Sequence, residues 1–162
     1  VVRLKRIDIL VNNVGTGRGD APPHAIEEEA WDRIMDINLK SMAMTIRHVL
    51  PIMRGQKSGA ILNISSLAAV ASAGGLTAYK LAKAGVNALT QNLAITNAKY
   101  GVRANAVAPG YTVTDAQVDH VSAHPEHAVA MREQRALARD ETPDDLAGPM
   151  TDAEDRVLVR FT

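Results

Sequence analysis

Tyr79 and Lys83 stand four residues apart, a spacing that places both side chains on one face of a helix. An ammonium group one turn away favours the phenolate and lowers the pKa of a phenol from its usual value of about 10. A phenol tuned in this way can exchange a proton with an alcohol, or with the alkoxide that hydride addition to a carbonyl leaves. The spacing therefore predicts general acid–base chemistry on a small carbonyl or alcohol.

Two more polar residues precede this pair. Ser66 follows a predicted strand and can donate a hydrogen bond to a developing oxyanion, and Asn38 lies inside a long predicted helix. Each residue also has an ordinary structural interpretation. In that interpretation Lys83 is solvated, Tyr79 packs half-buried, Ser66 caps the next segment and Asn38 bonds to the helix backbone. Their joint occurrence at this spacing favours a catalytic set of Asn38, Ser66, Tyr79 and Lys83.

The elements that must position these residues alternate along the chain. Short apolar runs predict buried strands at residues 7–11, 59–64 and 102–107. Apolar residues at every third or fourth position predict helices at residues 27–53 and 76–100, and the apolar stripe of the second helix includes Leu81. This order is typical of an α/β protein with a parallel sheet, and functional groups then gather at the carboxyl ends of the strands.

Composition excludes several classes of function. The 162 residues, 46% of them hydrophobic, are enough for one core, so we expect residues 1–162 to form a single domain. The absence of cysteine excludes disulfides, cysteine-bound zinc and thiolate nucleophiles. Zero net charge and 3% aromatic residues argue against nucleic-acid binding. Because no apolar run approaches the roughly 20 residues of a membrane span, we expect a cytoplasmic protein without a membrane partner.

Charge is unevenly distributed along the chain. Residues 37–110 contain no acid and eight basic residues, whereas eleven acids and five arginines follow Gly110. A positive middle suits an anionic small ligand. Alternatively, the two halves neutralise each other across the fold or across a contact between copies.

A glycine-rich turn at residues 15–20 follows the first predicted strand, where a dinucleotide-binding fold would cradle phosphate. Asp20 stands where that fingerprint requires its third glycine, and its carboxylate would face the phosphates. Pro22 and Pro23 then separate the turn from the next predicted helix. These features weigh against a phosphate cradle here.

The three histidines His120, His124 and His127 form the only histidine cluster in the sequence. Pro125 interrupts any helix that would align the first two, and His120 lacks the following glutamate of a metalloprotease motif. We therefore expect an exposed polar loop and no metal site.

The chain resembles the short-chain dehydrogenase/reductase family through motifs that occur in the family's order and spacing over about residues 7–147. The motifs are Asn-Asn-Val-Gly at 12–15, Ile-Asn-Leu-Lys at 37–40, Asn-Ile-Ser-Ser at 63–66, Tyr79 with Lys83, and Asn-Ala-Val-Ala-Pro-Gly at 105–110 with Thr114. The resemblance implies a partial Rossmann-type fold with a doubly wound parallel sheet. It also implies an NAD- or NADP-dependent oxidoreductase that interconverts a small carbonyl and an alcohol.

The same resemblance assigns roles to individual residues. Tyr79 would be the general acid/base, Lys83 would hold the nicotinamide ribose, Ser66 would bind the substrate oxygen and Asn38 would anchor a proton-relay water. The implied cofactor-binding residues are Asn13, Val14, Gly15, Ile64, Tyr79, Lys83, Pro109, Gly110, Thr112 and Thr114. Members of the family usually associate through the two long helices, so we expect a homo-oligomer.

Two features depart from the family pattern. The glycine-rich cofactor turn Thr-Gly-x-x-x-Gly-x-Gly has no match, and residues 148–162 form an atypical tail. The chain thus reads as the catalytic half of such an enzyme, truncated at both ends, and we expect these 162 residues alone to bind NADH or NADPH weakly or not at all. Two alternatives stay open: a noncatalytic, self-associating domain that has lost its cofactor, and a shortened enzyme that binds nucleotide in an altered way.

Overall fold

A computed structural model of the chain describes residues 6–71, 75–112, 122, 129 and 141–146. Three strands form one parallel sheet in the order β1-β2-β3, with β1 at Ile9–Asn12, β2 at Gly59–Ile64 and β3 at Val102–Val107. The α/β class and the parallel sheet predicted from the sequence are confirmed. Strands β2 and β3 have the predicted bounds, whereas β1 begins two residues later and ends one residue later than predicted.

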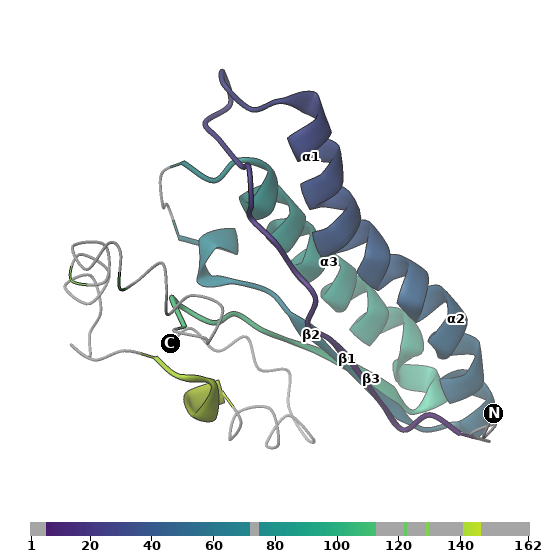
Figure 1. Cartoon of the computed structure of the whole chain (residues 1–162). Coiled ribbons are helices and arrows are strands. Elements are labelled where there is room, and N and C mark those ends of the chain that lie inside the picture. The colour runs from purple at the N-terminus through teal and green to yellow at the C-terminus, as the bar shows by residue number, and fades with distance from the viewer. Residues whose placement is uncertain (1–5, 72–74, 113–121, 123–128, 130–140, 147–162) are drawn as a thin grey trace, which may run out of the picture.

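Both connections between the strands are helical. The first contains α1 (Glu28–Met35), a π-helical turn η1 (Asp36–Lys40) and α2 (Ser41–Gln56). The second contains the short 3₁₀ turn η2 (Leu67–Ala69), α3 (Ala78–Asn97) and the 3₁₀ turn η3 (Ala98–Tyr100). The long helices lie on one side of the sheet in Figure 1, and residues 141–146 lie on the other.

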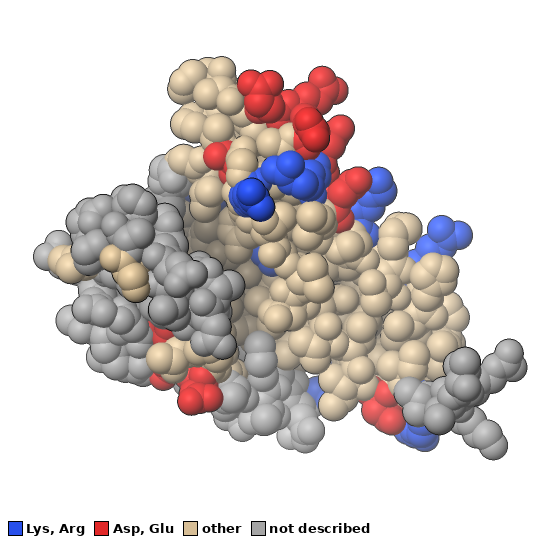
Figure 2. Space-filling model, viewed as in Figure 1, with Lys and Arg blue, Asp and Glu red and all other residues tan. Residues whose placement is uncertain are grey.

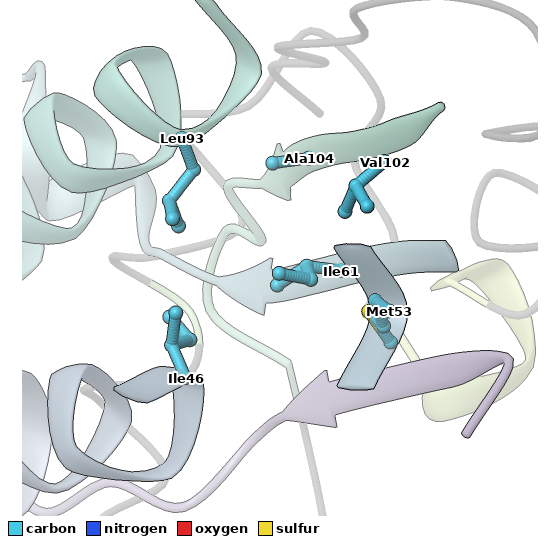
Figure 3. Close-up of a cluster of buried hydrophobic side chains, with 6 residues drawn as sticks. All are labelled: Ile46, Met53, Ile61, Leu93, Val102 and Ala104. Atoms are coloured by element: carbon cyan, nitrogen blue, oxygen red, sulfur yellow. The ribbon is translucent and has the colours of Figure 1, made fainter. Parts of the chain in front are cut away.

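The main core lies between the sheet and these helices. Alternate strand residues point to the same face of a sheet, so Ile61 of β2 and its register partner Ala104 of β3 both face the helices. Figure 3 shows them converging with side chains from α2 and α3. The complete cluster is Ile46, Met53, Ile61, Leu93, Val102 and Ala104. Burial of these apolar side chains holds both helices against the sheet.

A chain of buried polar side chains, which we call the amide ladder, crosses from β1 to α3 and consists of Asn12, Asn63 and Thr90. Asn12 Nδ2 donates to Asn63 Oδ1 at 2.8 Å, and Asn63 Nδ2 donates to Thr90 Oγ1 at 2.9 Å. The hydroxyl of Thr90 in turn donates to the Val86 carbonyl at 2.7 Å. The ladder therefore fixes the position of α3 along the sheet.

Two predicted burials are wrong. The sequence predicts a buried first strand, yet the side chains of Ile9 and Val11 are exposed, that of Ile9 to 65%. β1 is an edge strand among the described residues, and its helix-facing side is the one packed against the core. Leu81 belongs to the predicted apolar stripe of α3 but is also exposed, whereas Ala82 and Val86 of the same stripe are buried.

Candidate active site

The carboxyl ends of the three strands meet at one edge of the sheet, where most of the predicted site residues lie. Ser65 N donates to the Val107 carbonyl at 2.7 Å, and Leu67 N donates to the Pro109 carbonyl at 2.8 Å. These bonds extend the pairing of β2 and β3 beyond the strands themselves. Ser66 and Pro109, which are 43 residues apart in sequence, are thereby brought together.

Asn38 is completely buried in the π-helical turn η1. Its Nδ2 donates to the carbonyl oxygens of Ile34 at 2.8 Å and Thr16 at 2.7 Å, and its Oδ1 accepts from Thr16 N at 3.1 Å. The expected backbone bond within the helix is therefore present. The two hydrogen bonds between Asn38 and the backbone of Thr16 are not predictable from the sequence, and they hold the segment that follows β1 against the helix. Isolated π turns are often found at functional sites.

Lys83 is 2% exposed, so the interpretation of it as a solvated helix residue is wrong. Its Nζ donates to the Ile64 carbonyl at 2.7 Å. A Cβ added at Gly15 would lie 3.3 Å from Lys83 Nζ and 2.8 Å from Asn38 Oδ1, so the backbone approaches this closely only because residue 15 is glycine. We call Gly15, Asn38, Ile64 and Lys83 the Lys83 cluster. Burial lowers the pKa of Lys83 to about 8.

Tyr79 is half-buried in the first turn of α3, with Lys83 Nζ 5.6 Å from the centre of its ring. Burial raises the pKa of the Tyr79 hydroxyl, and a hydrogen bond with Ser66 partly offsets this rise. The expectation that Lys83 lowers this pKa is therefore wrong for the described structure. Removal of the phenolate from water outweighs the favourable interactions around it.

Ser66 combines the two interpretations given for it. Its Oγ accepts from Ala68 N at 3.2 Å and so caps η2, while the hydroxyl also bonds to Tyr79. The neighbouring Ser65 donates to the backbone carbonyl of Lys83 at 3.2 Å. The structure thus brings Asn38, Ser66, Tyr79 and Lys83 to the same end of the sheet.

The predicted cofactor-binding residues surround this cluster. Asn13, Val14 and Gly15 are exposed beyond β1, and Pro109 is buried at the end of β3. Thr112 is half-buried and its hydroxyl donates to Glu141 Oε1 at 3.0 Å. Ile64 contributes its carbonyl to Lys83, Gly110 follows Pro109, and Thr114 lies outside the described residues.

The glycine-rich turn at 15–20 does not open a helix, because α1 begins only at Glu28. Sequence reasoning missed two participants here, Thr16 and Asp20. Their partners lie 22 and 57 to 59 residues away, so no local spacing could have revealed them.

Within the described ranges, no helix is both long and apolar enough to span a membrane. Nor do three or more histidine, aspartate or glutamate side chains of the described residues gather as a metal site would need. His120, His124 and His127 lie outside these residues.

Comparison with known proteins connects this geometry to a family. Residues 1–151 match the family model described as enoyl-(acyl carrier protein) reductase. A 3-oxoacyl-(acyl-carrier-protein) reductase from a Synechocystis strain is 37% identical over 146 residues, which cover 90% of this chain and 56% of that protein. The chain spans about half the length of the curated relatives it matches.

Solved structures of similar proteins support the same family. An oxidoreductase of the short-chain dehydrogenase/reductase family from Burkholderia thailandensis superposes with a TM-score of 0.84 at 34% identity, covering 93% of this chain and 59% of that one. A gluconate 5-dehydrogenase from Burkholderia cenocepacia, in complex with NADP and tartrate, gives a TM-score of 0.83 at 30% identity, covering 89% and 56%. These overlaps confirm the Rossmann-type fold predicted above.

Proposed function

The chain belongs to the short-chain dehydrogenase/reductase family, and from this membership we propose that its site interconverts a small carbonyl compound and its alcohol with NAD or NADP. The observation that carries the proposal is the buried amine of Lys83 beside Tyr79 and Ser66. Burying an amine costs stability, and such costs are typical of sites that bind or react.

The residues present suit the nicotinamide–ribose part of the cofactor. Gly15 lacks the side chain that would press against Lys83, so the strand end offers an open backbone beside an amine donor. We assign ribose binding to Lys83 and Tyr79, and place Asn13, Val14, Gly15 and Ile64 on one side of the nicotinamide and residues 109–114 near its carboxamide. The bound cofactor supplies or accepts the hydride.

Tyr79 handles the proton. Because burial raises its pKa, the phenol is protonated at neutral pH and is suited to donate to the alkoxide in the reductive direction. Ser66 donates a second hydrogen bond to the same oxygen. In the oxidative direction the phenol must first lose its proton, which the hydrogen bond with Ser66 favours and burial opposes.

The main role that we assign to Asn38 is to hold neighbouring backbone in place. Both hydrogens of its amide are committed to the carbonyls of Ile34 and Thr16. Its Oδ1 retains one lone pair, which a relay water could use. Asn38 therefore holds the segment after β1 against Lys83, whether or not a water is bound.

Two variants test the assignment by separating binding from chemistry. In a form of the protein that binds the cofactor, Tyr79→Phe is expected to lower turnover of a ketone panel by roughly 10²- to 10⁴-fold with nearly unchanged cofactor affinity, because only the hydroxyl transfers a proton. Lys83→Ala is expected to weaken both. Turnover is followed by NAD(P)H absorbance and affinity by calorimetric titration, with Tyr100→Phe as the matched control. Retained turnover in Tyr79→Phe would overturn the assignment.

Cofactor affinity also separates the alternatives. Phosphate contacts from backbone amides, at about 1.5 to 3 kcal/mol each, provide much of the affinity for a dinucleotide, and no such loop is recognisable in the sequence. We therefore expect the 162-residue chain to bind NADH and NADPH with a dissociation constant above roughly 1 mM. A micromolar constant would instead favour a shortened enzyme with an altered nucleotide site. If neither this chain nor a longer form of the protein binds the cofactor or turns over substrate, the noncatalytic domain is favoured.

Self-association is a second proposal, carried by the outer faces of α2 and α3. Neither helix contains an acidic residue, and both expose large apolar side chains, with Ile95 80% exposed. Figure 2 shows acids gathered over α1 and a broad uncharged surface below them. We propose that a second copy covers this surface. A cytoplasmic location and a single domain remain proposals as well.

Sedimentation velocity tests the association. Ile95→Glu is expected to shift the chain to monomer at micromolar concentration, because a carboxylate cannot be buried there without a partner. Ile9→Glu, a matched change on the opposite side of the sheet, is expected to leave the association unchanged. A wild-type chain that is monomeric at the same concentration contradicts the proposal.

A further inference from the structure

Asp20, in the glycine-rich turn, binds the start of α3. Its Oδ1 accepts backbone N–H groups from Ala21 at 2.9 Å, Thr77 at 3.0 Å and Ala78 at 3.1 Å. Its Oδ2 accepts from Tyr79 N at 2.8 Å. The first turn of a helix leaves N–H groups without partners inside the helix, and one distant carboxylate satisfies three of them here.

The helix has no local replacement for this cap. Thr77 occupies the N-cap position, but its side chain makes no capping bond and donates instead to the Ala21 carbonyl at 2.7 Å. The turn and the helix are therefore joined by bonds in both directions. The negative carboxylate also interacts favourably with the positive end of the helix dipole.

The other end of the same segment is anchored to the first helical connection. Asn38 holds Thr16 by two hydrogen bonds, and Arg33 Nη2 donates to the Arg18 carbonyl at 2.7 Å. Between these anchors, a Cβ added at Gly17 would lie 3.8 Å from the ring of Tyr79. Residues 16–21 thus connect η1 to the first turn of α3 and pass beside the Tyr79 ring.

We propose that Asp20 is a positioning residue for the reaction proposed above, on which this inference rests. By fixing the backbone of Tyr79, Asp20 sets the place of the phenol relative to Lys83 and Asn38. Proton transfer depends steeply on such placement, since donor and acceptor must come within hydrogen-bonding reach. Loss of the carboxylate therefore affects the chemical step more than the binding of substrate.

Two substitutions dissect the cap. Asp20→Ala removes all four accepting bonds. Asp20→Asn keeps an oxygen for Ala21, Thr77 and Ala78, but places an amino group against the N–H of Tyr79. Amide hydrogen exchange is therefore expected to accelerate by roughly tenfold at residues 77–79 in Asp20→Ala, and at Tyr79 alone in Asp20→Asn. Asp32→Asn, an exposed change on α1, is the matched control and should alter neither.

Two readouts distinguish positioning from simple stabilisation. In carbon NMR of tyrosine-labelled chain, both Asp20 variants are expected to shift the ring signal of Tyr79 and to leave that of Tyr100 unchanged. In any form with turnover, kcat is expected to fall about tenfold or more in Asp20→Ala, and less in Asp20→Asn, with KM nearly constant.

The outcomes are separable. If no cofactor-binding form of the wild-type protein shows turnover, the proposed function fails, and the NMR signal of Tyr79 alone decides the role of Asp20. An unmoved Tyr79 signal in both variants overturns the inference, even if amide exchange accelerates. Wild-type kcat in an active Asp20→Ala variant overturns it as well. If Asp20→Ala does not fold, Asp20→Asn, which keeps three of the four bonds, provides the same test.

Discussion

Two groups of buried polar side chains lie next to each other along α3, and they differ in how their hydrogen-bonding groups are used. In the amide ladder, Asn63 is completely buried, and neutral donors and acceptors from Asn12 and Thr90 match it on both sides. In the Lys83 cluster, an amine with three donors is buried, and the hydrogen bond that it makes to a described residue goes to the Ile64 carbonyl, next to Gly15.

The difference separates a structural network from a candidate functional one. Neutral, reciprocal bonds stabilise the sheet against the helix, because each polar group exchanges water for an equivalent partner. A buried amine instead carries a desolvation cost, which appears as the lowered pKa of Lys83. Burial of the Lys83 amine beside Tyr79 does not stabilise the fold. We therefore expect this amine to serve in ligand binding.

The largest stability effect is expected in the ladder. Asn63→Ala leaves Asn12 Nδ2 and Thr90 Oγ1 without their partner and opens a small cavity, so we expect a loss of about 2 to 4 kcal/mol in the free energy of unfolding. Urea denaturation measures this, with Asn92→Ala on the exposed face of α3 as the control that should change by less than about 0.5 kcal/mol. If Asn63→Ala lowers the free energy of unfolding by less than about 1 kcal/mol, the amide ladder contributes no more than an ordinary surface contact.

The Lys83 cluster is expected to respond to pH. The pKa of Lys83 is about 8 in the folded chain and about 10.5 when unfolded, so between these values the unfolded state binds the extra proton. Stability therefore rises with pH across this window. Below about pH 8, the buried Lys83 amine is charged in the folded chain, and its burial destabilises the fold by the full amount. Relative to Lys83→Met, which cannot titrate, wild-type stability should rise by roughly 2 to 3 kcal/mol from pH 7 to pH 10.

Urea unfolding of both proteins at several pH values measures that difference, because titration of all other groups cancels between them. The raised pKa of Tyr79 acts in the opposite direction only above about pH 10, where the unfolded state loses its phenolic proton first. If the stability difference between the wild type and Lys83→Met does not change between pH 7 and 10, Lys83 is solvated, as in the ordinary structural interpretation of the sequence.

Much of the fold could be predicted because its signals are local. Apolar runs between turn residues gave β2 and β3 their bounds, and the helical spacing of Tyr79 and Lys83 placed both at one end of α3. The exposure of Ile9 could not be predicted, since an apolar run looks the same in a covered strand and in an edge strand.

The site's supporting contacts could not be predicted for a different reason. Asn38 with Thr16, and Asp20 with the start of α3, join segments 22 to 59 residues apart through backbone groups that every sequence possesses. The π turn at η1 and the burial of Lys83 likewise depend on tertiary packing. Residue types therefore indicated which side chains could react, while the residues that hold them became visible only in the structure.

The smallest effect is expected at Gly15, which belongs to the Lys83 cluster and not to the amide ladder. In Gly15→Ala the new Cβ would lie 2.8 Å from Asn38 Oδ1, which its bond to Thr16 holds in place, so we expect a loss of about 1 to 2 kcal/mol. Gly55→Ala, inside α2 with no heavy atom within 4 Å of the added Cβ, is a control of opposite sign and should gain up to about 1 kcal/mol from helix propensity. Thermal unfolding of the two variants therefore moves in opposite directions. Equal stabilisation of both would show that the backbone after β1 yields to a side chain, and that the close approach to Lys83 is not required by the fold.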